Sequence, residues 1–390
     1  RNAMFVYLDN SSTTKPYPQV IETMTRVLSE DFGNPSSLHT LGFTAEQYVK
    51  TARKAIADAL GANSGEIYFT SGGTEADNTA IFGAAQLRRR ECKKIITTGV
   101  EHPAVLEAAR RLEAMGWQVE YIGVDRKCRL DMDALKAAMT SDTALISVMS
   151  VNNETGTIMP IDEIAKAKER FNKENGAHIL LHTDAVQAFG KIPVTTAGVD
   201  MISVSGHKVH GPKGIGALYV KKGLNLPPFI VGGGQEMNMR SGTENMPGIA
   251  GFGRAVQIFS ENTRERAAAM SAARKRLLQD LMSGAKDISI NSPDGDDACP
   301  SVLNISFLGV RGEVLLHTLE QDGIFVSTGS ACSSNKKGRS HVLKAMGLSD
   351  KEIEGAVRFS FSEFNTVEEM DYVAEKTIQA AERFRRLGRR

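Results

Sequence analysis

The sequence predicts an α/β protein whose mostly parallel sheet is covered by helices on both faces. Between about residues 44 and 220, short apolar runs alternate with helical segments, as they do when crossover helices join parallel strands. Past about residue 255 the pattern changes to a long polar helix followed by mixed short strands and helices, which predicts a smaller α+β domain. With 390 residues, 41% of them hydrophobic and 24% charged, the composition is that of an ordinary globular protein.

The near-neutral net charge argues against partners, such as nucleic acids and anionic membranes, that bind through a strong overall electrostatic field. The 47 basic and 46 acidic side chains leave a formal net charge of +1, so we expect no direct nucleic-acid partner and no membrane partner. No apolar run approaches the roughly 20 residues that cross a bilayer, and the first residues carry no signal-peptide pattern. We therefore expect a cytoplasmic protein.

The elements follow in order along the chain. The first clear helix is predicted to begin with Thr44 and Gln47, which have capping-box spacing, and to stop at Gly61. A strand over residues 67–70, a glycine turn and a helix from near Thr74 come next. Further strands are predicted at 94–98, 117–124, 143–151, 178–184, 200–206, 216–220, 302–307 and 356–361. Further helices are predicted at 161–176, 261–282, 312–321 and 366–384.

Polar residues follow several of these strands, at the carboxyl ends where parallel sheets bind ligands. Gly72 and Gly73 let the backbone approach a ligand, and the helix that opens at Thr74 suits a phosphate, although a purely structural glycine turn has the same sequence. Asn152, Asn153 and Glu154 follow the strand at 143–151, and Asp184 and Gln187 follow the next one. His182 and Asp184 also fit a metal pair, and Asp184 fits a helix cap.

The strand at 200–206 leads into Ser205, His207 and Lys208. A lysine at a buried strand end is costly unless it is paired, neutralised or covalently engaged, and the alternative is a lysine that extends to solvent. The glycine-rich run at 211–216 lacks Walker spacing and precedes a strand, so we do not expect a nucleotide site. A phosphate cradle, the carboxylate of Asp184 and a lysine 24 residues later are what pyridoxal 5'-phosphate requires. His102, after the strand at 94–98, adds a ring that can stack on this cofactor.

The chain has four cysteines, Cys92, Cys128, Cys299 and Cys332. They form neither a CxxC pair nor a metal-ligand cluster, so we expect free thiols and no metal. Cys332 lies among glycine and small hydroxyl residues, which predicts an exposed loop and a reactive thiol. A basic run follows it at Lys336, Lys337 and Arg339. These cations lower the pKa of the thiol, dock a partner or are simply solvated.

At this point the sequence resembles the cysteine desulfurases of the NifS and IscS type, which belong to the class V aminotransferase group of fold-type I pyridoxal phosphate enzymes. The likeness runs through nearly the whole chain, in the segments 7–14, 34–39, 69–78, 101–106, 151–156, 182–187, 205–220, 232–245, 327–334 and 357–361. It implies a seven-stranded, mostly parallel sheet in a large domain at 16–255. It also implies a smaller domain at 256–390 that carries the cysteine loop and is joined by the segment 1–15.

The resemblance also implies roles for single residues. Lys208 would hold the cofactor as a Schiff base, Asp184 would pair with the ring nitrogen and His102 would stack on the ring and move protons. Gln187 and Asn153 would contact the ring edge, with Asn153 also near the substrate. The phosphate would be held by Gly73, Thr74, Ser205 and His207, and by Thr243 from the neighbouring subunit of a homodimer. Arg358 would bind the substrate carboxylate, a task that suits its fork, unless it is a solvated arginine at a strand end.

By the same resemblance, L-cysteine is converted to L-alanine and its sulfur is left as a persulfide on Cys332. The sulfur then passes to a protein acceptor, such as an iron–sulfur scaffold, a tRNA-thiolation enzyme or a protein of cofactor biosynthesis. The loop has the length of the long-loop group, unlike the SufS relatives. Arg339 and His341 stand where IscS proteins often carry proline and tyrosine, which leaves the acceptor open.

Two other functions fit parts of this pattern. Another fold-type I enzyme, such as a selenocysteine lyase or a class V aminotransferase, shares the cofactor residues, since a fold does not fix a reaction. The reactive Cys332 favours the desulfurase. A non-catalytic sulfur-relay scaffold would keep the fold alone, and the joint presence of Lys208, Asp184, His102 and Cys332 argues against it.

Overall fold

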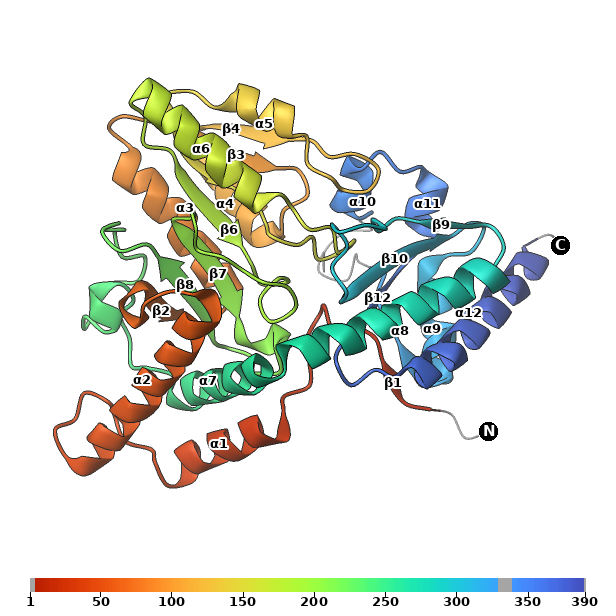
Figure 1. The fold of residues 1–390 in the computed structure, drawn as a ribbon, viewed down its shortest axis with the longest axis horizontal. Helices are drawn as coiled ribbons and strands as arrows, with labels where there is room; N and C mark the ends of the chain where they lie inside the picture. Colours follow the sequence, from red (N-terminus) through yellow and green to blue (C-terminus); the bar gives the residue numbers. More distant parts are fainter. Residues whose placement is uncertain (1–3, 329–338, 389–390) are drawn as a thin grey trace.

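A computed structural model describes residues 4–328 and 339–388. The larger part of the molecule is built on a seven-stranded sheet (Figure 1). Its strands, in spatial order, are β2 (Ile67–Thr70), β8 (Gly216–Val220), β7 (Met201–Ser205), β6 (Leu180–Asp184), β5 (Thr143–Ser147), β3 (Lys94–Thr98) and β4 (Gln118–Ile122). Strand β8 is antiparallel to both of its neighbours and the other pairs are parallel. The predicted mostly parallel α/β sheet is confirmed.

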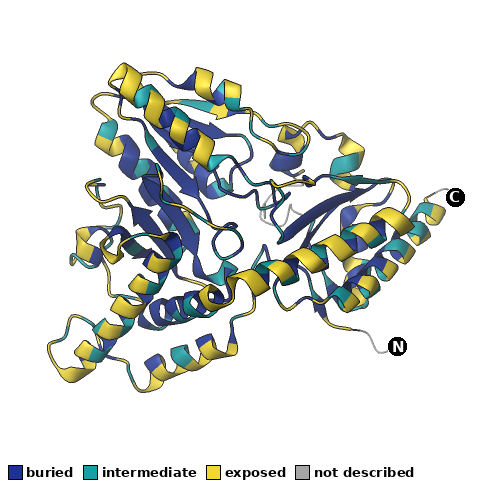
Figure 2. Ribbon diagram, viewed as in Figure 1, coloured by how far each residue is buried: buried dark blue, intermediate teal, exposed yellow. Residues whose placement is uncertain are grey.

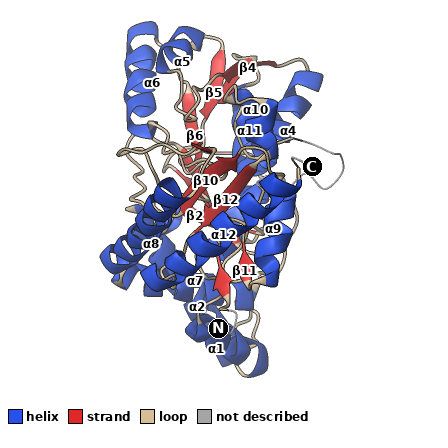
Figure 3. Ribbon diagram, turned by 90° about the vertical axis from the view of Figure 1, so that its right-hand side faces the viewer, coloured by secondary structure: helices blue, strands red, loops and turns tan. Residues whose placement is uncertain are grey.

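Helices cover both faces of this sheet because successive strand residues point to opposite sides. Ile95 and Leu145 belong to one apolar core and their neighbours Ile96 and Ile146 to another. The first core is closed by α3 (Gly73–Arg88) and α4 (Pro103–Ala114), and the second by α2 (Thr40–Leu60), α5 (Met132–Ala138), α6 (Ile161–Asn175) and α7 (Met246–Glu261). Apart from the edge strand β4, of which only Ile122 is buried, the strands are accordingly mostly buried and the helices expose their outer faces (Figure 2), with the strands lying between helical layers (Figure 3).

The predicted start of the first clear helix is wrong, and one earlier helix was not predicted. Helix α2 begins at Thr40, one turn before Thr44, because the His39 ring accepts a hydrogen bond from the Gly42 amide (3.3 Å) and supplies the cap. Its end at Gly61 is confirmed, since Gly61 has the left-handed conformation (φ 68°) that ends helices. Helix α1 (Pro18–Ser29) has no predicted counterpart: Val20 and Val27 are its only buried residues, too few to mark an apolar stripe.

The smaller part has its own core. The antiparallel sheet β12 (Ala356–Ser360), β10 (Val302–Phe307) and β9 (Ile288–Ile290) packs with α8 (Thr263–Gly284), α9 (Gly312–Gln321) and α12 (Val367–Leu387). Strand β1 (Val6–Tyr7) pairs in parallel with β11 (Ile324–Phe325), which draws the N-terminal segment into this core. Helix α7 packs in the large core and α8 in the small one, so we propose that the domain boundary lies between them, near residue 262, a few residues after the predicted position near 255.

Two short helices, α10 (His341–Ala345) and α11 (Asp350–Glu354), precede β12. Val342 and Leu343 of α10 return to the core of the large sheet, although they follow β11 of the smaller part in the chain. Among the described residues no helix is long and apolar enough to span a membrane.

Candidate functional site

The residues predicted at the strand ends converge on one cavity of about 260 Å³. Its lining contains predicted residues from six separate segments, namely Gly73, Thr74, His102, Asn153, Asp184, Gln187, Ser205, His207, Lys208 and Arg358. Thr243 is exposed and is not part of the lining. Cys332, Lys336 and Lys337 lie outside the described residues. Arg339 is described, and its guanidinium forms an ion pair with Asp350 at the start of α11.

Lys208 ends a single 3₁₀ turn, Gly206–Lys208, directly after β7. Its ammonium donates hydrogen bonds to the carbonyl oxygens of Ser11 (2.5 Å) and Ser12 (2.8 Å), so the head group lies in the cavity and does not extend to bulk solvent. From behind, the Lys191 ammonium donates to the Lys208 carbonyl oxygen (3.0 Å). Burial lowers the pKa of Lys191 to about 7, so this supporting lysine is about half protonated at neutral pH, whereas an exposed lysine is fully charged.

Asp184 ends β6 and is buried. One of its oxygens accepts a hydrogen bond from the Val186 amide (3.0 Å), so the predicted capping contact is present while the side chain also lines the cavity. A second buried carboxyl, Asp77 of α3, lies beside it. Burial and the neighbouring Asp184 raise the pKa of Asp77 well above its usual value, so Asp77 is the member of the pair that keeps a proton.

His182 is a core residue and not a metal ligand. Its ring nitrogens pair with the hydroxyls of Ser147 and Ser203, both at 2.8 Å, and burial lowers its pKa to about 4. In the described part of the chain, no group of three or more His, Cys, Asp and Glu side chains is arranged to hold a metal ion.

His102 is oriented by the helix that it starts. Its Nδ1 accepts a hydrogen bond from the Ala104 amide (3.1 Å) as the N-cap of α4, so the neutral ring carries its proton on Nε2. Burial lowers the pKa of His102, and the Asp184 carboxylate opposes that shift only in part. The ring is therefore neutral: its Nδ1 is bonded to the helix, and its Nε2, which carries the proton, is not used in that contact.

Two features of the lining are suited to a polar ligand. The Gln187 amide donates to the Ser11 carbonyl (3.0 Å), whereas its Oε1 is buried and has no hydrogen-bond partner among the described residues. At the start of α3 no side chain of the described residues caps the helix, and a Cβ on Gly73 would lie 2.9 Å from Val186 Cγ2. Only glycine fits there without displacing the wall. Burial also lowers the pKa of His207 to about 4, which leaves this ring neutral.

Arg358 is buried in β12 with 5% of its surface exposed, so a solvated arginine is excluded. Its Nη1 donates to the Asn153 carbonyl (3.0 Å), and its Nη2 donates to Asp9 Oδ1 (3.1 Å) and Ser12 Oγ (2.8 Å). The guanidinium thus joins the small sheet to the N-terminal segment and to the loop after β5.

The sequence reasoning missed several residues of this site. Ser11 and Ser12 line the cavity through backbone and hydroxyl oxygens, for which the sequence carries no periodic signal. Asp77 had a usable signal, since it lies one turn after Gly73 on the helix predicted to face a ligand. Glu101 precedes His102 and is fully buried, accepting hydrogen bonds from Thr98 Oγ1 (2.6 Å) and the Met149 amide (2.8 Å).

The chain is similar to known proteins over nearly its whole length. The chain matches the family model aminotransferase class-V over residues 6–373. It is 45% identical to a cysteine desulfurase of Trichormus azollae, with 98% of this chain and 94% of the relative covered, and 43% identical to the cysteine desulfurase IscS of Methanosarcina thermophila, with 98% and 93% covered.

Among solved structures, a NifS-like protein at 38% identity superposes with a TM-score of 0.89, covering 97% of this chain and 100% of that one. SspA, solved in complex with cysteine, superposes at 35% identity with a TM-score of 0.81, covering 93% and 100%. These likenesses extend over nearly the entire length, and the protein accordingly belongs to the aminotransferase class-V family, within which it is a pyridoxal-phosphate-dependent cysteine desulfurase.

Proposed function

We propose that Cys332 is the residue that takes the sulfur. L-cysteine and the Cys332 thiol give L-alanine and a persulfide on Cys332, so the two electrons lost by sulfur reduce the substrate carbon and no outside oxidant is needed. The observation that carries this proposal is the convergence of Lys208, Asp184, His102 and Arg358 on one cavity. The likeness to SspA, which was solved with cysteine, supports this substrate.

The lining fits the cofactor of the family. Asp184 would face the ring nitrogen, and the unpartnered Gln187 Oε1 would accept a hydrogen bond from the ring hydroxyl. The uncapped start of α3, with Gly73 and Thr74, would hold the phosphate together with Ser205 and His207. When bound, pyridoxal phosphate supplies an aldehyde that captures amines and a ring that accepts electrons from a neighbouring bond.

Each residue of the chain then has a task. Lys208 would hold the aldehyde and, once the substrate amine replaces it, move a proton with its freed amine. His102, neutral and with its proton on Nε2, would stack on the ring and is the second group able to exchange a proton there. Arg358 would bind the substrate carboxylate, with Asn153 next to it. The Cys332 thiolate would attack the substrate sulfur as the carbon–sulfur bond breaks.

Two substitutions test these roles. Lys208→Ala should abolish alanine release, whereas Cys332→Ser should keep the visible absorbance of the bound cofactor and its change on adding cysteine but form no persulfide. Full persulfide formation by Cys332→Ser would contradict the proposal. An enzyme that transaminates and never forms a persulfide would instead favour the class V aminotransferase alternative.

We also propose that the enzyme is a homodimer in which Thr243 reaches the neighbouring phosphate site, in keeping with its exposed position outside the cavity. Mixing Lys208→Ala with Thr243→Ala subunits tests this, because a mixed dimer then contains one intact site. Recovered activity on mixing supports a shared site, and two inactive parents that stay inactive contradict it.

The sulfur acceptor is proposed only by class: an iron–sulfur scaffold, a tRNA-thiolation enzyme or a protein of cofactor biosynthesis, all in the cytoplasm. A pull-down with wild type and with a variant neutralised at Lys336, Lys337 and Arg339 identifies acceptors. An unchanged set of partners would exclude these charges from docking.

A further inference from the structure

The described residues on both sides of the segment 329–338 are hydrogen-bonded to residues that line the cavity or that adjoin its lining. On one side, Ser327 pairs with Arg358 through two backbone hydrogen bonds of 2.7 and 3.1 Å. On the other side, the Ser340 hydroxyl donates a hydrogen bond to the Glu154 carboxylate. Arg358 also donates to the carbonyl of Asn153, the residue before Glu154. Arg358 and Asn153 line the cavity and Glu154 adjoins Asn153, so the described residues before and after Cys332 are bonded to one connected group beside the cavity.

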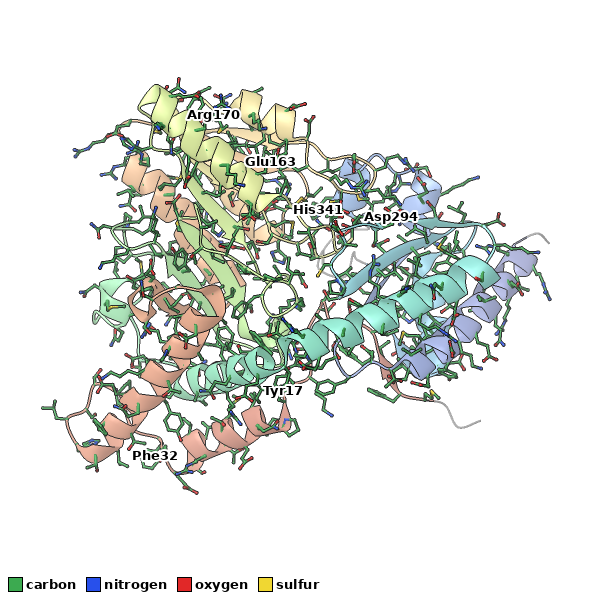
Figure 4. All side chains as sticks on the ribbon, in the orientation of Figure 1. Tyr17, Phe32, Glu163, Arg170, Asp294 and His341 are labelled. Atoms are coloured by element: carbon green, nitrogen blue, oxygen red, sulfur yellow. The ribbon has the colours of Figure 1, made fainter. Side chains whose placement is uncertain are left out.

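The Ser340 hydroxyl has two functions in this arrangement. It accepts a hydrogen bond from the Leu343 amide (3.1 Å) as the N-cap of α10, and it donates to Glu154. The next residue, His341, pairs through its Nε2 with the Glu101 carbonyl oxygen (2.8 Å), one residue before His102. His341 thus lies where α10 meets the large sheet (Figure 4). The chain after Cys332 is held at two points beside the cofactor loops.

Glu154 is costly at this position. It is 3% exposed, and burial raises its pKa to about 7 while the Ser340 hydrogen bond opposes that shift. Its loop is already held by backbone contacts, since its amide donates to Asn152 Oδ1 (2.9 Å) and its carbonyl accepts from Asn304 (3.0 Å). A buried carboxyl with one side-chain donor adds little to folding compared with an apolar residue of the same size. We therefore look for the role of the Glu154 carboxyl in its hydrogen bond with Ser340.

We propose that Glu154 and Ser340 are positioning residues whose hydrogen bond fixes the point at which the chain bearing Cys332 rejoins the cavity wall, and so sets the rate at which Cys332 takes sulfur from bound cysteine. This inference rests on the proposed function of Cys332.

The test separates the contact from the helix cap. Glu154→Met removes the acceptor and leaves the Ser340 cap in place, Glu154→Gln keeps an acceptor of the same shape, and Ser340→Ala removes both functions. Single-turnover experiments with L-cysteine measure two quantities for each holoenzyme. These are the absorbance change on cysteine binding and the rate of persulfide formation on Cys332, followed by mass spectrometry.

We expect Glu154→Met to form the persulfide about tenfold more slowly, which corresponds to about 1.4 kcal/mol, with unchanged cysteine binding and melting temperature. Glu154→Gln should restore most of the rate, and the double variant Glu154→Met, Ser340→Ala should be no slower than Ser340→Ala.

A Glu154→Met enzyme with the wild-type rate would overturn the inference. So would a double variant whose loss is the sum of the two single losses, because the residues would then act separately. Failure of the underlying function is distinguishable, since persulfide would then form in Cys332→Ser.

Discussion

Replacing Arg358 by lysine keeps the positive charge in the cavity and removes the fork. The guanidinium uses two nitrogens, one on the Asn153 carbonyl and the other on Asp9 and Ser12. A lysine ammonium has one nitrogen, so it cannot span these partners and also offer two parallel N–H groups to a carboxylate. One hydrogen bond to a charged group contributes about 1.5–3 kcal/mol, so the KM for L-cysteine should rise about 10- to 100-fold.

Steady-state alanine formation against cysteine concentration measures this effect. The turnover number should change little, because the carboxylate is held equally before and during the reaction. Arg170→Lys is the matched control, because Arg170 lies on α6 at the outer edge of the molecule (Figure 4), is exposed and does not line the cavity. Cysteamine, which lacks the carboxylate, should not distinguish Arg358→Lys from wild type. An unchanged KM for cysteine, or an equal loss with cysteamine, would refute the carboxylate assignment.

Three further predictions concern Glu101, Arg266 and Gly73. Burial raises the pKa of Glu101 from 4.5 to about 8, so the stabilisation from its bound proton is complete below pH 4.5 and is lost as the pH rises through 8. Between pH 6 and 8 the free energy of unfolding of wild type should fall by on the order of 2 kcal/mol relative to that of Glu101→Gln. An equal change in the free energy of unfolding of the two proteins between these pH values would contradict this prediction. Arg266→Met removes the cation 2.6 Å from the part-buried Glu363 and leaves this carboxylate only the Tyr17 hydroxyl and the His210 ring, so it should lower stability by about 3 kcal/mol in urea denaturation. The exposed neighbour variant Arg264→Met should change stability by less than about 0.5 kcal/mol. Gly73→Ala should weaken pyridoxal phosphate binding about tenfold in equilibrium dialysis, because its Cβ crowds Val186, whereas Gly65→Ala, where nothing lies within 4 Å, should bind normally.

The site residues at the strand ends were predictable because an apolar run, which marks a buried strand, is followed there by a charged residue. Lys208 and Asp184 each follow an apolar run, and the register β6–β7 brings those two ends side by side. The contribution of the N-terminal segment was not predictable in the same way. Ser11 and Ser12 act through carbonyl oxygens that every residue type carries, and Asp9 meets Arg358 across 349 positions of the chain.

The prediction that α2 begins at Thr44 was wrong for a related reason. Thr44 and Gln47 have the sequence of a cap, but a ring nitrogen of His39 forms it one turn earlier. Local patterns name the residue types that are able to cap a helix, and tertiary contacts decide which of them does so.

Because β8 is antiparallel to β2 and β7, it runs from the cavity edge of the sheet to the opposite edge, and this direction identifies a place for a linker or tag. Gly216 begins β8 at the cavity edge, opposite Thr70 and Ser205, and a Cβ there would lie 2.7 Å from the Gly72 backbone. The connection 209–215 therefore ends where the backbone is closely packed, and an insertion there would disturb the cavity edge. Because β8 runs against its neighbours, it ends at the opposite edge, where Lys221, Lys222 and Gly223 are exposed. An immobilisation linker or affinity tag inserted at this turn leaves the sulfur chemistry facing away from the support.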